Sequence, residues 1–188
     1  ELLNKAEFTV TITEESKNRR AMYQAEEKRN QLMVDGNEDT VAFLKKCNLQ
    51  IEIFAPRTDS EILRCYELIV RTNQLNMSGK KYSKNEFNDV LNRTGHKNFA
   101  FSCKDDFGEY GIVGFGQYRV GQETLIFTEF AMSCRVAGKY VESALFAFLL
   151  KMENCQSGKF EISITKKNSL LRNTLKEIGF SIEQESTN

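Results

Sequence analysis

The chain has 188 residues, of which 40% are hydrophobic and 28% are charged, and its 26 basic side chains balance its 26 acidic ones. This length and composition suit one domain of ordinary size with some additional chain, while the lack of a basic excess argues against a general nucleic-acid binder. No apolar run approaches the roughly 20 residues that cross a bilayer, which argues against a membrane protein.

The first 47 residues differ in pattern from the rest of the chain. Residues 13–32 are heavily charged and helix-forming with only a thin apolar stripe, and such a helix usually lies against a neighbour or bridges two domains. The sequence DGN at 35–37 breaks this helix, and 38–47 predicts a short second one. We therefore predict that 1–47 is a helical linker or tail. Because the chain begins at Glu1 rather than Met, we expect it to be a piece of a longer protein.

An α/β (α+β) domain is predicted for residues 48–188, where strand and helix patterns alternate. Strands are predicted at 49–54, 98–105, 109–120, 123–134 and 159–165, with a short last strand at 180–184. Helices are predicted at 58–75, 83–95, 168–179 and directly after the turn 135–140. Both faces of the strand 123–134 are largely apolar, so it should be central in a mixed sheet that carries helices on both faces.

The turn 135–140 joins this central strand to an apolar helix, whose buried face is predicted from residues at helical spacing. These are Val141, Ala144, Leu145, Phe148, Leu149 and Met152. The first N–H groups of such a helix have no partner within it, so they and the helix dipole favour an anion, and Arg135 and Lys139 add positive charge. From the residues alone, the turn is either a phosphate site or a simple strand-to-helix connection.

The pattern Arg135-x-x-Gly138-x-Tyr140 resembles the R/Q-x-x-G-x-G/A turn of the GNAT superfamily of N-acetyltransferases, and the element order over 49–182 is similar to that fold. KEIGF, at 176–180, resembles the end of its last helix. The resemblance implies that the turn amides hold the pyrophosphate of CoA or acyl-CoA, and that a splayed gap beside the central strand takes the pantetheine. The cofactor-binding residues that we predict are Met132, Cys134, Arg135, Val136, Ala137, Gly138, Lys139, Tyr140 and Asn168.

Three further stretches, 71–83, 133–142 and 166–180, together resemble the C-terminal GNAT-like domain of FkbH-type proteins. Those proteins carry a HAD-superfamily domain in front and are associated with loading a three-carbon glyceryl unit onto an acyl carrier protein. Residues 19–32 resemble the tail that follows the HAD domain. The resemblance therefore implies a phosphopantetheine thioester as ligand, with an acyl carrier protein and a preceding HAD domain as partners. The HAD motif D-x-D-x-T is absent, so the phosphoryl chemistry of that half is not in this chain.

Two positions depart from the GNAT pattern. Tyr140 stands where Gly or Ala is usual, and Leu175 stands where a Tyr commonly protonates the leaving thiolate. Both departures favour a second interpretation, in which the domain is a non-catalytic docking module for a carrier protein. A third interpretation is a stand-alone N-acetyltransferase that acts on an unknown amine.

Glu129 is the candidate catalytic base, because GNAT enzymes often place a carboxylate in this central strand. A semi-buried Glu has a raised pKa and is able to take a proton from an amine directly or through water. The alternative is a Glu whose hydrogen bonds only support the edge of a cleft. Glu142 is interpreted as a helix-dipole partner, and nothing in the sequence marks Cys134 as an activated nucleophile.

A polar run at the end of the first predicted domain helix is the candidate substrate-binding segment. It comprises Thr72, Asn73, Gln74 and Asn76. Capping explains one or two such residues, whereas a set of this size before SGKKYS is expected to line a ligand cleft. The alternative is capping alone.

The five cysteines are widely spaced and include no C-x-x-C pair, which favours reduced thiols over a disulfide framework or a zinc site. We therefore expect a cytoplasmic protein. The single His96 also argues against a histidine-rich metal site, and no metal is predicted.

Overall fold

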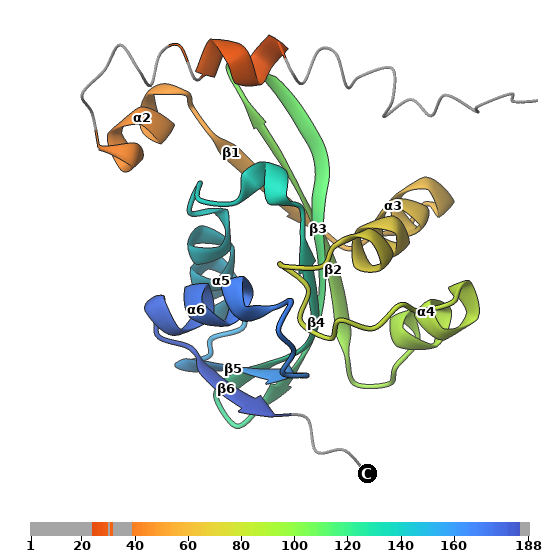
Figure 1. Ribbon diagram of the computed structural model, residues 1–188. Coiled ribbons are helices and arrows are strands. Elements are labelled where there is room, and N and C mark those ends of the chain that lie inside the picture. Colours follow the sequence, from red (N-terminus) through yellow and green to blue (C-terminus); the bar gives the residue numbers. More distant parts are fainter. Residues whose placement is uncertain (1–23, 30, 32–38, 185–188) are drawn as a thin grey trace, which may run out of the picture. The chain divides into compact units, whose positions relative to one another are not determined.

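The computed structural model describes residues 24–29, 31 and 39–184, which divide into two compact units (Figure 1). Of the described residues, the first unit comprises those up to Leu49 together with Lys104–Glu109, and the second comprises Gln50–Cys103 and those from Tyr110 onward. The first 23 residues, which hold half of the predicted charged helix, lie outside the described part. Within that described part, no helix is both long enough and apolar enough to cross a membrane.

The first unit is held together by a buried ion pair. Residues 24–29 and 31 are helical, and α2 follows at Thr40–Lys46. The guanidinium of Arg29 donates two hydrogen bonds, of 2.6 and 2.7 Å, to the carboxylate of Asp105. Paired donors in this fork geometry fix both side chains. The unit therefore includes residues 104–109, which the predicted tail 1–47 did not.

A six-stranded sheet in the order β1-β2-β3-β4-β5-β6 organises the fold. The strands are β1 Gln50–Phe54, β2 Lys97–Asp105, β3 Gly108–Gly121, β4 Thr124–Met132, β5 Ser157–Ile162 and β6 Ser181–Gln184. β3 and β4 pair antiparallel, whereas β4 with β5 and β5 with β6 pair parallel. The sheet is mixed, as predicted, and β4 lies inside it with a strand on each side.

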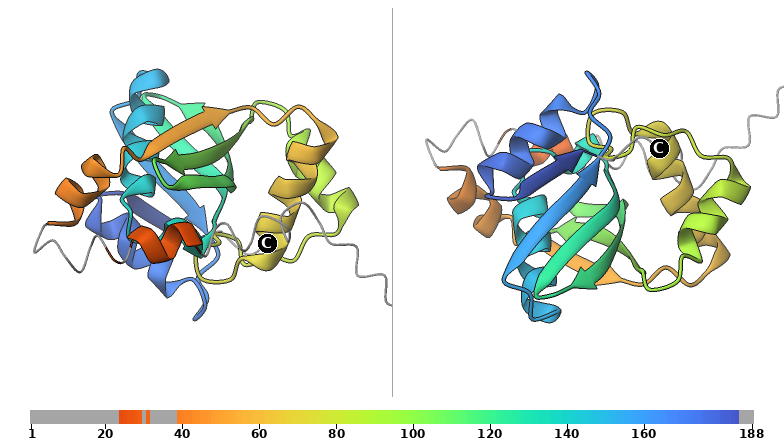
Figure 2. Two further views of the ribbon diagram at one scale, coloured as in Figure 1. Left: turned by 90° about the horizontal axis from the view of Figure 1, so that it is seen from above. Right: turned by 90° about the horizontal axis from the view of Figure 1, so that it is seen from below.

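Helices cover both faces of the part of the sheet that belongs to the second unit, as Figures 1 and 2 show. The helices are α3 Asp59–Arg71, α4 Lys84–Leu91, α5 Val141–Met152 and α6 Ser169–Glu177, with α3 and α4 on one face and α5 and α6 on the other. Capping boxes begin α3 at Thr58 and α4 at Ser83. Each satisfies N–H groups that a helix start leaves unpaired.

The face under α5 and α6 is packed with phenylalanine rings. Phe127 stacks on Phe160 with ring centroids 4.4 Å apart, and Phe127 and Phe130 both contact Phe146 at 5.1 Å. Regular alternation along the strand 123–134 predicts Phe127 and Phe130 on opposite faces, and this prediction was wrong. A β-bulge shifts the β3–β4 register between Gln117 and Tyr118, and such a bulge changes the face to which the following side chains point.

Two glycines in β3 make room for the rings of Phe101 and Phe99, which lie on β2. A Cβ at Gly114 would lie 1.9 Å from the Phe101 ring, and one at Gly116 would lie 2.3 Å from the Phe99 ring. Neither distance is possible without a shift of the ring or of the strand. Gly114 and Gly116 are therefore required by packing.

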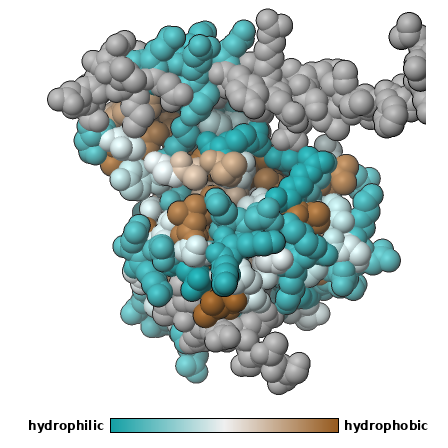
Figure 3. All heavy atoms as spheres, viewed as in Figure 1, coloured by the Kyte–Doolittle hydropathy of each residue, from teal (hydrophilic) through white to brown (hydrophobic). Residues whose placement is uncertain are grey.

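The buried face of α5 differs from the predicted one. Phe146 is fully buried, whereas Phe148 and Met152 are 51% and 52% exposed. The helix buries Val141, Glu142, Leu145, Phe146 and Leu149. The prediction was wrong at Ala144, Phe148 and Met152 because apolar residues lie all round this helix, so periodicity does not select one face. On the face of the molecule in Figure 3, exposed apolar side chains form small separate groups.

Candidate functional site

The turn between β4 and α5 contains two residues in the left-handed conformation. Residues Cys134–Val136 form a short 3-10 turn, after which Gly138 has a φ of 71° and Tyr140 a φ of 53°. Glycine adopts this region at little cost, and a Cβ at Gly138 would meet nothing within 4 Å. Tyr140 adopts the same left-handed region although a Cβ makes it unfavourable, and its side chain is exposed.

The first turn of α5 begins without a side-chain cap. Tyr140 is its N-cap residue and makes no side-chain hydrogen bond to the helix, and the first bond to the Tyr140 carbonyl comes from Ala144 at 3.1 Å. Leading N–H groups of an uncapped helix attract an anion, and the helix dipole adds to this effect. The ammonium of Lys139 lies over the Tyr110 ring at 5.8 Å from its centroid.

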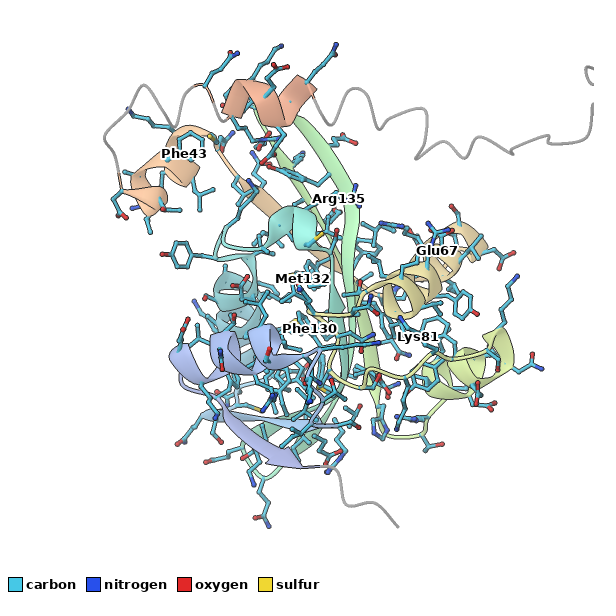
Figure 4. All side chains as sticks on the ribbon, viewed as in Figure 1. Phe43, Glu67, Lys81, Phe130, Met132 and Arg135 are labelled. Carbon is cyan, nitrogen blue, oxygen red and sulfur yellow. The ribbon has the colours of Figure 1, made fainter. Side chains whose placement is uncertain are left out.

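The predicted cofactor-binding residues separate into an exposed set and a buried set. Cys134, Ala137, Gly138 and Tyr140 are exposed, and Arg135 and Lys139 are half-buried. The Arg135 guanidinium reaches back to the Ser133 hydroxyl at 3.2 Å, and Figure 4 shows Arg135 at the turn above Met132 and Phe130. Met132, Val136 and Asn168 are buried. The structure thus brings six of the predicted residues to the outside of one turn and uses the other three in the interior.

The amide of Asn168 is already committed within the fold. Its Nδ2 donates to the carbonyl oxygens of Met77, at 3.2 Å, and Ser163, at 2.7 Å, while its Oδ1 accepts the N–H of Thr165. The side chain is fully buried. Because buried polar groups are stabilised by such complete pairing, Asn168 acts as a brace between two loops in this structure.

Glu129 is buried on β4 and is bonded to a tyrosine that the sequence analysis did not select. The hydroxyl of Tyr82 donates to Oε1 of Glu129, which is 3% exposed. Burial raises the pKa of Glu129, while the Tyr82 hydrogen bond and the charges of Arg93 and Lys80 act against that rise. Burial and the Glu129 charge also raise the pKa of Tyr82. The pair forms a buried, hydrogen-bonded unit of a carboxyl and a phenol, of the kind that general acid–base chemistry uses.

The signal that could have identified Tyr82 is its position in SGKKYS, directly before the Ser83 cap. A tyrosine next to a helix start has its backbone fixed, and here the Tyr66 hydroxyl also donates to the Tyr82 carbonyl at 3.0 Å. Leu175, by contrast, is fully buried in α6. The only phenol hydrogen-bonded to Glu129 among the described residues is thus that of Tyr82, on the α3–α4 face.

The four predicted substrate-binding residues have different environments. Thr72 ends α3, and Asn73 and Gln74 are exposed, with Asn73 Oδ1 accepting a hydrogen bond from Lys81 at 3.1 Å. Asn76 is 1% exposed, and both the nitrogen and the oxygen of its side-chain amide form hydrogen bonds to nearby residues. Its Nδ2 donates to Ile69 and Thr72 carbonyls, and its Oδ1 accepts the N–H of Gly79. Asn73 and Gln74 are therefore the members of the set that face solvent, whereas Asn76 shapes the loop.

The loop that contains Asn76 also pairs with β4. The N–H of Met77 donates to the Phe130 carbonyl at 2.8 Å, and the N–H of Met132 donates to the Leu75 carbonyl at 2.9 Å. Pairing between β4 and β5 extends only as far as Phe127. Beyond that point, the edge of β4 that faces away from β3 is therefore occupied by residues 75–77.

No protein-family model matches the sequence, and no curated protein matches it. Among solved structures, a domain from Methanocaldococcus jannaschii has a TM-score of 0.51 at 14% identity, covering 69% of this chain and 86% of that one. The ribosomal-protein-S18-alanine N-acetyltransferase of Escherichia coli has a TM-score of 0.48 at 14% identity, covering 69% and 77%. The PaiA N-acetyltransferase of Thermoplasma acidophilum, solved with coenzyme A, has a TM-score of 0.46 at 13% identity, covering 71% and 91%.

At these identities a structural likeness concerns the fold, and not the chemistry of the site. The observed element order follows the one expected from the GNAT resemblance. With the fold shared by the archaeal domain, it confirms the predicted α/β fold class, a mixed sheet with helices on both faces.

Proposed function

We propose that this chain is a GNAT-like domain that binds a phosphopantetheine thioester, as CoA or on an acyl carrier protein, and assists acyl or glyceryl transfer. The observation that carries the proposal is the turn between β4 and α5. It presents an uncapped helix start, the exposed Gly138 in the left-handed region, and Arg135 at the preceding bend. An anionic phosphate group is the ligand that such a turn favours.

Glu129 and Tyr82 are the groups that we propose for proton transfer. The raised pKa of Glu129 makes its carboxylate a stronger base than an exposed glutamate, and Tyr82 holds the carboxyl in one orientation. As a base, Glu129 would take the proton of the attacking nucleophile, and it would return that proton to the leaving thiolate. In this scheme Leu175 has no part, which agrees with its burial in α6.

The resemblance to FkbH-type proteins suggests which thioester and which partners the domain has. In that context the domain would receive a glyceryl thioester made by a preceding HAD domain of the same protein, in the cytoplasm, and an acyl carrier protein would bring it. Two neighbouring loops each carry a pair of exposed lysines, Lys80 and Lys81 on one and Lys166 and Lys167 on the other. The loops approach each other at Gly79 and Thr165, where a Cβ on Gly79 would lie 3.7 Å from the Thr165 methyl group. This basic cluster suits the acidic surface of a carrier protein.

A second candidate is the non-catalytic docking module. It is favoured by the pairing of residues 75–77 with β4, because that pairing occupies the gap proposed for the pantetheine. In the docking function, the domain would hold a carrier protein for the HAD domain and would leave the thioester itself outside.

Calorimetric titration of the chain tests the proposal, with CoA, acetyl-CoA, a phosphopantetheinylated carrier protein and the same carrier without its prosthetic group. We expect binding of CoA that is lost in Gly138→Glu, because this substitution puts a negative charge in the turn. Gly95→Glu is the matched control, since Gly95 also has a positive φ, 75°, and open space around it. An equal loss of CoA affinity in Gly138→Glu and Gly95→Glu would contradict a phosphate site in the turn. Binding of both carrier forms, with no binding of CoA, would instead identify the docking module.

A further inference from the structure

We propose that residues 75–78 form an autoinhibitory strap, which must leave the edge of β4 before a pantetheine arm can lie there. This inference rests on the proposed function, since it concerns the thioester site of that proposal. It assigns to the loop after α3 a regulatory role in place of substrate contact.

The first observation is that β4 has no free edge next to the turn. On one side, β4 pairs with β3 as far as Met132. On the other side, the partner β5 is lost after Phe127, and the freed groups at Phe130 and Met132 bond to the strap. Each of these two bonds is shorter than 3.0 Å in its donor–acceptor distance, as in regular β-pairing.

The second observation is that the strap is part of the interior. Leu75 and Met77 are 3% and 0% exposed, and Ser78 is 7% exposed. The strap is held from both sides, by β4 and by the Asn168 amide at the Met77 carbonyl. Asn76 closes the loop with hydrogen bonds to the end of α3 and to Gly79. Such a segment leaves its place only at a substantial free-energy cost.

The strap and a pantetheine arm compete for the same backbone groups of β4. A pantetheine arm carries amide groups, which in the gap beside β4 would pair with the Phe130 carbonyl and the Met132 N–H. Those groups already have partners in the strap, and the two occupants exclude each other. The apparent affinity for CoA is then the intrinsic affinity reduced by the small fraction of molecules with the strap released. Weakening the strap should therefore tighten CoA binding.

Calorimetry with CoA on Leu75→Ala tests this competition. The substitution removes a buried side chain from the strap and leaves its backbone unchanged. Leu125→Ala is the matched control, because Leu125 is an equally buried leucine at the far end of β4. We expect Leu75→Ala to bind CoA about tenfold more tightly than the unaltered chain. We expect Leu125→Ala to show no such gain. Unchanged, weaker or undetectable CoA binding by Leu75→Ala overturns the strap.

Hydrogen exchange on the unaltered chain gives a second measurement that does not depend on a variant. The Met77 and Met132 amides should both be protected in the free protein. With saturating CoA, the Met77 amide should exchange at least about tenfold faster, whereas the Met132 amide should stay protected by its new partner. Protection of Met77 that persists with CoA bound overturns the strap.

The two proposals fail in different ways. If Gly138→Glu abolishes CoA binding while Leu75→Ala has no effect and Met77 stays protected, the phosphate site is right and the strap is wrong. If neither CoA nor the phosphopantetheinylated carrier binds to the unaltered chain or to Leu75→Ala, both are wrong.

Discussion

The two faces of the sheet in the second unit are built from different chemistry. Under α5 and α6, buried phenylalanine rings contact one another, with Phe127 at the centre of the group. Under α3 and α4, apolar residues share the interior with Glu129, Gln117 and Asn76, each of which is at most 3% exposed. The first face gains mainly from the burial of apolar area, whereas the second also depends on the hydrogen bonding of its buried polar groups.

This difference indicates that the α5–α6 face contributes most to stability, whereas the candidate reactive groups lie on the α3–α4 face. A buried carboxyl is unfavourable for stability unless it is paired, and the pairing of Glu129 with Tyr82 points to a functional demand on the α3–α4 face. The β-bulge in β3–β4 is the structural device that separates the two faces, since it sends Phe127 and Phe130 to one side and leaves Glu129 on the other.

The largest effect is expected from Phe127→Ala, on the phenylalanine face. The ring is fully buried, and its loss should lower the free energy of unfolding by about 3–5 kcal/mol. Phe87→Ala, on the opposite face, removes a ring whose aromatic partners in the described part of the chain are Tyr66 and Phe115, and it should have a smaller effect. Urea denaturation measures both. A larger loss in Phe87→Ala would reverse the proposed division between the faces.

An intermediate effect is expected from Glu129→Gln. The amide still accepts the Tyr82 hydrogen bond but carries no buried charge, so the free energy of unfolding at pH 7 should rise by about 1 kcal/mol. Because the pKa of Glu129 is raised in the folded state, the unaltered chain loses stability as the pH rises above 4.5 through the folded pKa.

That pH dependence is measured by urea denaturation between pH 4 and pH 8. The loss of stability with rising pH should be smaller in Glu129→Gln than in the unaltered chain. It should be larger in Tyr82→Phe, because the phenol no longer stabilises the charged carboxylate. Parallel pH profiles of all three proteins would show that Glu129 does not titrate as a buried group.

The smallest effect is expected from Tyr140→Gly, outside both faces. Its left-handed backbone is unfavourable for tyrosine, and glycine relieves that cost while it loses more entropy on folding. We expect a net gain of about 0.5 kcal/mol, seen as a small rise in the thermal midpoint. Tyr140→Ala, the control, keeps the strained backbone and should show no gain. Equal midpoints for the two variants would contradict the strain.

Much of the fold could be predicted because its signals are local. The cap at Ser83, the alternation in the early strands and the glycine turn after the central strand each depend on neighbours in the chain. The buried face of α5 could not be predicted in the same way, because Phe146 and Phe148 are equally apolar and only the neighbouring rings select one.

The sequence by itself determined the α/β class, the order of the elements and the turn at 135–140, because backbone preferences and apolar periodicity act over a few residues. The tertiary structure alone decided the partner of Glu129, the pairing of residues 75–77 with β4 and the use of Asn168 as a brace. These contacts join residues that lie 47 to 91 positions apart in the chain. Contacts between residues so far apart in the chain depend on which backbone and buried polar groups still lack hydrogen-bond partners once the sheet has formed. No local sequence pattern shows which groups these are.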